Sequence, residues 1–345
     1  MAHMDVFRQR AFHMVEMSAA VQRAPYKPNF LGSLNLFTTK RVRTPTVSVE
    51  DKGGVLSLIQ TSERGAPISE GEREKRNLRD FRTVRIARGH TLYAHEIDGI
   101  RAFGTDSELQ MVQNEVAEIM SGETGLRAAV DLTHENMRLG AIQGVVVDAD
   151  GSTLWNWFDA FGIQQPGEID FDLDAANPQS GAVRTKCNQV VRSMQRAAQG
   201  AWNPQTSVVG LCGDAFFDQL TSHAEVRSTY LNQQEAADLR GAVGRVFSSF
   251  TYGDITWVNY RGTDDNATVA IGTDKCKFLP VNAPGAFVQA FSPAEFLPFV
   301  NTPGQDVYAI VVEDKERQAW VRPEIYSYPL FMCTRPGMLL RAKRT

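Results

Sequence analysis

The chain has 345 residues, of which 43% are hydrophobic and 22% charged, a composition that is ordinary for folded proteins and excludes collagen-like, coiled-coil or largely disordered chains. Its formal net charge of −4 disfavours nucleic-acid binding through a general basic field. We find neither a run of about eighteen apolar residues nor a secretory leader pattern, so we expect no membrane span and a cytoplasmic location. We interpret residues 1–3 as a remnant of expression before a natural start at Met4.

The first predicted element is a loosely amphipathic helix over 5–21, which Pro25 and Pro28 end. The segment that follows is too apolar for a solvated linker, yet its prolines and glycine prevent a regular element. Two interpretations remain open, an arm packed on its own domain and an arm laid along another subunit. The apolar side chains in question are Phe30, Leu31, Leu34, Leu36 and Phe37.

Apolar residues alternate with polar ones between Arg43 and Ile97, which predicts strands, with a tight hairpin turn at 51–54. The segment 62–78 within this region is highly charged and has hardly any apolar anchor, so it cannot fold on a core of its own. It is either a solvated loop or a tongue that a neighbouring subunit orders through complementary charges. The residues that would make such a contact are Arg64, Glu72, Arg73, Glu74, Lys75, Arg76 and Arg79.

The clearest helix begins at Thr105, where Glu108 completes a capping box. Apolar residues then follow at helical spacing as far as Ala141, interrupted by Gly122 and Gly125. The pattern predicts a long spine, either one kinked helix or two helices in tandem.

A hairpin is predicted next, over 145–158, with its turn at 148–151. Acidic and apolar residues alternate over 168–174, which places the carboxylates on one face of a strand. That face is either solvated or turned toward a divalent cation or a basic partner. Helices and strands alternate over 177–301, and strands predominate after 306.

Short motifs that suggest chemistry are all incomplete. His134–Glu135 resembles the start of a zinc-protease motif, but Arg138 stands where the second histidine is needed. The turn at 148–151 lacks the ligands of a calcium loop, and 210–214 lacks the second glycine of a nucleophile elbow. We therefore predict no catalytic, cofactor or metal site. The alternative hypothesis is a cytoplasmic α/β enzyme with an unrecognised active site in residues 177–301.

The four cysteines, Cys187, Cys212, Cys276 and Cys333, are far apart in the sequence. Because none has C-x-x-C spacing, a disulfide scaffold and a structural zinc site are both disfavoured. We expect buried thiols.

Several stretches in a particular order carry a resemblance to a known family. They are 25–32 with 36–37, 63–67, 138–144 leading into 148–151, 278–280 and 327–330. In these stretches the chain resembles the lambda-type major capsid proteins of tailed bacteriophages, including those carried as prophages, and the resemblance covers nearly its whole length.

The resemblance implies an α+β chain with the Hong Kong 97-type tailed-phage major capsid fold. It also supplies an explanation for an apolar arm and a charged tongue that lack cores of their own, since neighbouring subunits would order both. The implied regions are an N-terminal arm over 5–44, an extended β loop over 45–104, a peripheral domain with a long spine helix over 105–175 and 306–345, and an axial domain over 176–305.

The function implied by the resemblance is structural and non-enzymatic, without a cofactor. Copies would form hexamers and pentamers that close into an icosahedral shell, the phage head, around DNA that is enclosed without sequence-specific binding. The implied partners are a scaffold, a portal and a decoration protein, and the protein would assemble in the host bacterial cytoplasm and reside in the virion. The mild acidity suits such a shell, because a strongly basic lining would hold the genome in place.

Overall fold

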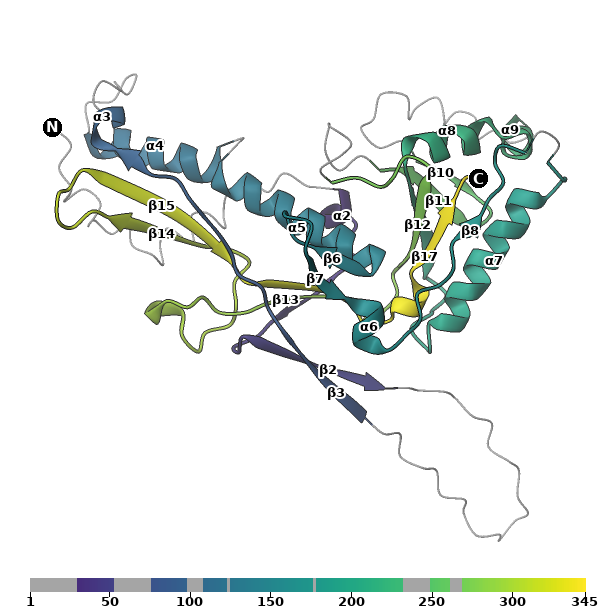
Figure 1. Cartoon of the computed structure of the whole chain (residues 1–345), viewed down its shortest axis with the longest axis horizontal. Helices are drawn as coiled ribbons and strands as arrows, with labels where there is room; N and C mark the ends of the chain where they lie inside the picture. The colour runs from purple at the N-terminus through teal and green to yellow at the C-terminus, as the bar shows by residue number, and fades with distance from the viewer. Residues whose placement is uncertain are drawn as a thin grey trace, which may run out of the picture.

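Helices and strands alternate along the residues that the computed structural model describes, which are 30–52, 76–97, 108–122, 125–175, 178–231, 249–260 and 269–345. Figure 1 shows two helices in line across the molecule, with a lobe built on a six-stranded sheet at one end and a long hairpin along the other. A two-stranded ribbon projects from the middle, away from both ends. This mixture of helices and mainly antiparallel sheets agrees with the predicted α+β class.

The two helices in line are α4 (Glu108–Ser121) and α5 (Leu126–Gln143). They confirm the second form of the spine prediction, two helices in tandem, because Gly125 is extended and starts a new helix. Gly144 ends α5 with a φ of 86°, a left-handed conformation that glycine adopts without strain.

The hairpin end consists of a four-stranded sheet that lies under the helices. Val116 and Met120 of α4 and Val130 of α5 pack against Val321 and Ile325 of this sheet. Helical spacing thus places one face of each helix on the alternate, inward-facing residues of a strand. The elements are β4 (Ile86–Gly89), β5 (Leu92–Tyr93), α3 (Ala94–Ile97), β14 (Tyr308–Glu313) and β15 (Trp320–Ser327).

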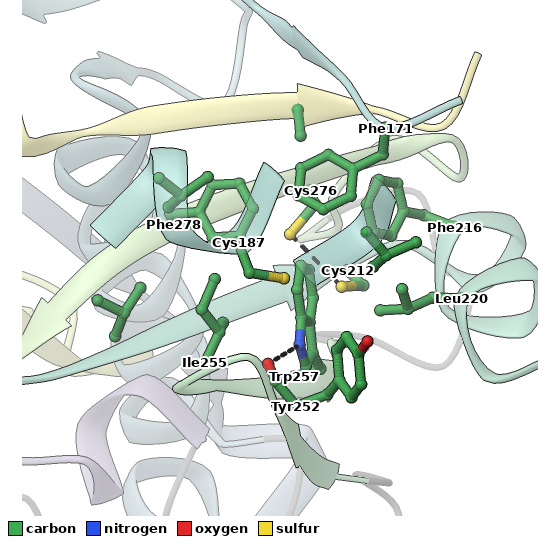
Figure 2. Close-up of a cluster of buried hydrophobic side chains, with 14 of the residues drawn as sticks. Phe171, Cys187, Cys212, Phe216, Leu220, Tyr252, Ile255, Trp257, Cys276 and Phe278 are labelled. Atoms are coloured by element: carbon green, nitrogen blue, oxygen red, sulfur yellow. Dashed lines mark hydrogen bonds between the residues drawn. The ribbon is translucent and has the colours of Figure 1, made fainter. Parts of the chain in front are cut away.

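The lobe at the other end, here called the sheet lobe, has the strand order β10-β11-β9-β12-β17-β8. Three helices cover one face of the sheet, and the other face packs on the end of α5 and on the residues around Leu31. In the first of these two cores the rings of Phe171, Phe216 and Phe278 have centroids 5.7, 6.0 and 5.5 Å from that of Trp257 (Figure 2). The elements are β8 (Ile169–Asp170), α7 (Ala182–Ala197), β9 (Ser207–Cys212), α8 (Asp214–Ser222), α9 (Ala224–Leu231), β10 (Ser249–Tyr252), β11 (Ile255–Asn259), β12 (Lys275–Val281) and β17 (Leu340–Lys343).

The cysteines lie inside, as predicted. Cys212 and Cys276 face each other on neighbouring strands with their Sγ atoms 3.4 Å apart, and Cys187 of α7 lies in the same core (Figure 2). All four thiols are free and buried. Burial raises the pKa of Cys187 and of Cys333 to about 12, so both remain protonated and unreactive near neutral pH.

A three-stranded sheet in the order β1-β13-β16 connects these parts, with β1 parallel to β13. The predicted hairpin after the spine is confirmed over 145–156, but Trp157 and Phe158 begin a short helix in place of extending a strand. The side chain of Asn156 caps that helix by accepting a hydrogen bond from Phe158 N at 3.1 Å. The elements are α2 (Phe30–Ser33), β1 (Thr38–Arg41), β6 (Val145–Val147), β7 (Thr153–Asn156), α6 (Trp157–Phe161), β13 (Phe287–Phe291), β16 (Pro329–Cys333) and the 3₁₀ turns η3 (Leu297–Phe299) and η4 (Pro336–Met338).

The ribbon pairs β2 (Thr46–Lys52) with β3 (Arg76–Arg82) in antiparallel register. The predicted tight turn at 51–54 is wrong, because Asp51 and Lys52 continue β2 and pair with β3. The turn-like residues are overridden by cross-strand hydrogen bonds, which a local pattern does not reveal. The root of the ribbon is held by Phe81, whose ring contacts the rings of Trp155 and Trp157 at 5.6 and 5.3 Å.

Candidate assembly surfaces

The apolar segment of the arm packs on its own chain, which corresponds to the first of the two interpretations. Leu31 has 0% of its surface exposed, so it has no surface left for a neighbour in this conformation. Phe37 contacts the rings of Phe287 and Phe331 at 5.3 and 5.7 Å. Phe30, Leu36 and Phe37 remain partly accessible. Their contact with another subunit stays a prediction.

A buried carboxylate holds this segment in place. Oε1 of Glu135, on α5, accepts the backbone N–H of Leu31 at 2.9 Å and the hydroxyl of Tyr260 at 3.3 Å. Its other oxygen lies 3.6 Å from the guanidinium of Arg138. Glu135 is 1% exposed, and burial, which outweighs these partners, raises the pKa of its carboxyl above the ordinary value. The sequence reasoning missed this role. The only sequence signal for this role was an acidic residue among the apolar residues of the predicted spine.

His134 points to a different neighbour than Glu135 does. Its Nε2 lies 3.0 Å from Oγ of Ser327 in β15, and that hydroxyl donates to the carbonyl of Asp306 at 2.6 Å. Burial lowers the pKa of His134 well below its ordinary value and keeps the ring neutral. The histidine and the glutamate therefore join α5 to β15 and to α2, and they do not converge on a shared site.

The predicted charged tongue falls largely outside the described residues, which applies to Arg64, Glu72, Arg73, Glu74 and Lys75. Arg76 begins β3, where its backbone pairs with Lys52. The guanidinium of Arg79 donates to the carbonyls of Ala160 and Phe161 and lies 5.2 Å from the centre of the Phe161 ring. Arg79 thus ties the ribbon to α6 of its own chain, and its predicted contact with a neighbour stays a prediction.

The acidic segment 168–174 does not form the continuous strand that the alternation predicts. Only Ile169 and Asp170 form β8. Asp172 then takes a positive φ of 49°, while Phe171 N and Leu173 N still donate to the carbonyls of Lys343 and Arg344. The acids instead meet lysines of the same lobe. The ion pairs are Glu168 with Lys275 at 2.9 Å, Asp170 with Lys343 at 2.9 Å and Asp172 with Lys186 at 3.4 Å.

A loop between β13 and β14 presents apolar side chains to solvent, which the sequence reasoning did not single out. We define residues 293–303 as the projecting loop, which lies below β14 in Figure 1. Leu297 is 90% exposed and Val300 52% exposed. The other side of the loop is anchored by Phe296, which contacts Tyr326 with ring centroids 5.0 Å apart, and by buried Phe299.

Among the described residues, no helix has the length and apolarity that crossing a membrane requires. No three or more His, Cys, Asp or Glu side chains of that part of the chain gather as a metal site would need. The candidate site is therefore a set of surfaces: the arm segment, the ribbon and the projecting loop.

Comparison with known proteins places the chain among phage shell proteins. The family model for phage major capsid protein E matches residues 13–344. The major capsid protein of Salmonella phage Felix O1 is 24% identical over 358 residues, which cover 95% of each chain. That of Pseudomonas phage KPP10 is 26% identical over 83% of this chain and 85% of its own.

Solved structures show the same fold. The crystal structure of a prophage capsid protein from E. coli CFT073 has a TM-score of 0.56 and 15% identity, covering 96% of this chain and 99% of its own. The capsid structure of cyanophage P-SCSP1u has a TM-score of 0.52 and 11% identity, covering 93% of this chain and 90% of its own. The predicted Hong Kong 97-type capsid fold is thereby confirmed. The relatives support a shell protein of the virion and not the alternative of a cytoplasmic enzyme. The chain belongs to the phage major capsid protein E family and is a structural protein of the phage shell.

Proposed function

We propose that copies of this chain form pentamers and hexamers that close into an icosahedral shell around phage DNA, without catalysis and without reading the DNA sequence. Assembly takes place in the host cytoplasm, with a scaffold, a portal and a decoration protein as further partners. The proposed regions are those implied by the family resemblance, with the arm over 5–44, the extended β loop over 45–104 and the axial domain over 176–305. The peripheral domain comprises 105–175 and 306–345.

The observation that carries this proposal is the ribbon. Beyond its root at Val47, Val49 and Phe81, the pair β2–β3 leaves the body of the molecule (Figure 1) and has Leu78 63% exposed. An isolated two-stranded ribbon is marginally stable in water, because one pair of strands buries too little apolar surface. A neighbouring subunit that covers the ribbon supplies the missing contacts, and each copy in a ring offers the same ribbon to the next copy.

The charges of the extended β loop provide the test. Reversing Arg73, Lys75 and Arg76 to glutamate is expected to abolish rings and shells in negative-stain micrographs, while the far-ultraviolet circular dichroism stays that of the parent. The reason is that charge-paired contacts repeat at every interface of a shell, although one exposed pair contributes only about 0 to 1 kcal/mol. Raising the salt from about 0.1 M to 1 M shortens the Debye length from about 10 Å to 3 Å and is expected to weaken ring formation of the parent.

The matched control exchanges the same residues without changing charge, as Arg73→Lys, Lys75→Arg and Arg76→Lys, and is expected to assemble. If the charge-reversed protein assembles like the parent at every salt concentration, the loop has no charge-driven assembly role. A parent that forms no rings or particles under any condition contradicts the proposed shell assembly itself.

A further inference from the structure

The projecting loop is built to hold an apolar side chain out into solvent. Phe299 is buried and contacts Tyr308 with ring centroids 4.7 Å apart, and Phe296 rests on Tyr326. The hydroxyl of Thr302 donates to the carbonyl of Phe299 at 2.7 Å, which tightens the turn. Leu297 is therefore displayed on a backbone that is already ordered, so a partner that covers it pays little conformational entropy.

A cleft of about 670 Å³ lies elsewhere on the chain, beside the root of the ribbon. Its apolar wall is formed by Val49, Leu78, Phe161, Pro284 and Val288. Leu78, at 63% exposure, is the most exposed of these large apolar side chains. The cleft thus combines an apolar wall with an unfilled volume large enough for several side chains.

The charges of loop and cleft are complementary. Glu295 is the only charged residue of the projecting loop, and its carboxylate lies 3.0 Å from the guanidinium of Arg85 with half of the side chain still exposed. Among the described residues that line the cleft, the charged ones are Lys40 and Arg335, and the Arg335 guanidinium also donates to the carbonyls of Ala198 and Gln199. Because Arg85 already pairs with Glu295, two loops that meet bring two ion pairs together, whereas a loop entering the cleft brings the exposed part of Glu295 toward the cations Lys40 and Arg335.

We propose that Leu297 of one copy inserts into the cleft of a second copy, with Glu295 facing Lys40 and Arg335. The inference rests on the proposed shell assembly and specifies one of its contacts. In the single subunit Leu297 is 90% exposed and does not line the cleft, so a copy does not fill its own cleft. The contact is heterologous: every copy offers one loop and one cleft, as contacts around a ring of identical subunits require.

Disulfide trapping in assembled particles tests the pairing. The four native cysteines are buried, so cysteines introduced at exposed positions can be oxidised selectively with a copper–phenanthroline catalyst and oxygen, which takes up the two electrons of each thiol pair. Leu297→Cys combined with Leu78→Cys is expected to give covalent dimers and larger oligomers on non-reducing gels. A disulfide requires Cα atoms within about 7 Å, so the bond reports direct contact.

The controls are Leu297→Cys alone and Leu297→Cys with Tyr93→Cys, a position 45% exposed and outside the cleft. Both are expected to remain monomeric on the same gels. Cross-links from Leu297→Cys alone mean that loops meet each other and overturn the inference. If the variant with both Leu297→Cys and Leu78→Cys forms normal particles but no disulfide between copies, the inference is overturned equally.

A charge exchange gives a second readout. Leu297→Glu is expected to lower the particle yield by about tenfold or more, as at a hot-spot anchor, while Leu297→Met retains it. Adding Leu78→Lys to Leu297→Glu is expected to restore particles. The melting temperature of each variant should match that of the parent, because both side chains are exposed in the single subunit. Normal shells from Leu297→Glu refute this contact and leave the proposed shell assembly intact.

Discussion

At the scale of single residues, Glu135 decides where the arm segment attaches. Its carboxylate is buried, and the backbone N–H of Leu31 and the hydroxyl of Tyr260 both donate to the same oxygen. A helix only four residues long, α2, is thus held at its start by a side chain from another helix. Burial dominates the titration of this carboxyl and raises its pKa.

Glu135→Ala is expected to lower the free energy of unfolding by about 1 to 3 kcal/mol or more, because it leaves the buried Leu31 N–H without its acceptor. Glu135→Gln retains an amide oxygen at the same place and is expected to lose less. Urea titrations followed by circular dichroism measure both values. Equal losses in the two variants contradict the hydrogen-bonding role of Oε1.

The same pair of proteins tests the sign of the pKa shift. Because the folded chain holds the Glu135 proton more tightly than the unfolded chain, this group stabilises the fold most below its ordinary pKa of 4.5. That contribution is lost as the pH rises through the raised folded-state pKa. The stability of the parent should therefore fall relative to that of Glu135→Gln over this window. A relative rise means that the hydrogen bonds outweigh burial.

At the scale of elements, the turn from α5 into the following hairpin depends on Gly144. Its φ is 86°, and a Cβ placed there would lie 2.2 Å from the ring of Phe158. The carbonyl of Gly144 accepts the N–H of Trp157 at 2.8 Å, so helix, hairpin and α6 meet at one backbone position. A side chain is excluded both by backbone conformation and by space.

Gly144→Ala is expected to lower the free energy of unfolding by about 1 to 2 kcal/mol, because alanine is strained in the left-handed conformation. A further loss of about 1 to 3 kcal/mol is expected, because the Phe158 ring must move to make room for the methyl group. Gly151 is the matched control, because its φ is 85° and nothing lies within 4 Å of its added Cβ. Gly151→Ala should show the conformational cost alone. Thermal or urea unfolding compares the two, and equal losses rule out the clash with Phe158.

At the scale of the whole molecule, the chain is elongated and leaves apolar side chains exposed at separate places, Leu78 on the ribbon and Leu297 on the projecting loop. A protein that functions as one subunit gains nothing from a ribbon held out from its body, whereas a shell gains an intersubunit contact. For the arm we propose both an assembly role and a role within its own subunit. Its segment around Leu31 completes the subunit's own core.

Two deletions separate these roles of the arm. Removing 5–29 is expected to block closed shells and to keep a cooperative melt near the parent's temperature. Removing 5–37 also takes away Leu31, whose burial contributes about 1.5 to 3 kcal/mol, and is expected to lower the melting temperature clearly. Calorimetry and negative-stain microscopy measure the two effects. Normal shells from the shorter deletion contradict an assembly role for 5–29.

Local patterns in the sequence were sufficient for much of this fold. Helical spacing interrupted by glycines predicted a spine of either one kinked helix or two in tandem, and turn residues at 148–151 predicted a hairpin that the structure confirms over 145–156. The absence of C-x-x-C spacing predicted buried thiols, and the order of several motifs predicted the family. These predictions hold because each depends on residues a few positions apart or on the order of segments along the chain.

The tertiary structure alone decided which distant residues meet. Glu135 and Leu31 are 104 positions apart, and nothing local to either predicts the hydrogen bond between them. Long-range pairing explains two further cases. The register of β2 with β3 overrides the turn predicted at 51–54. Lysines far away in the sequence form ion pairs with Glu168 and Asp170. By itself the sequence determined the spine, the hairpin that follows it and the family, because these depend on spacing and order along the chain. Burial, ion pairing and the exposure of Leu297 depend on how separate elements are brought together in space, and only the folded chain determines that.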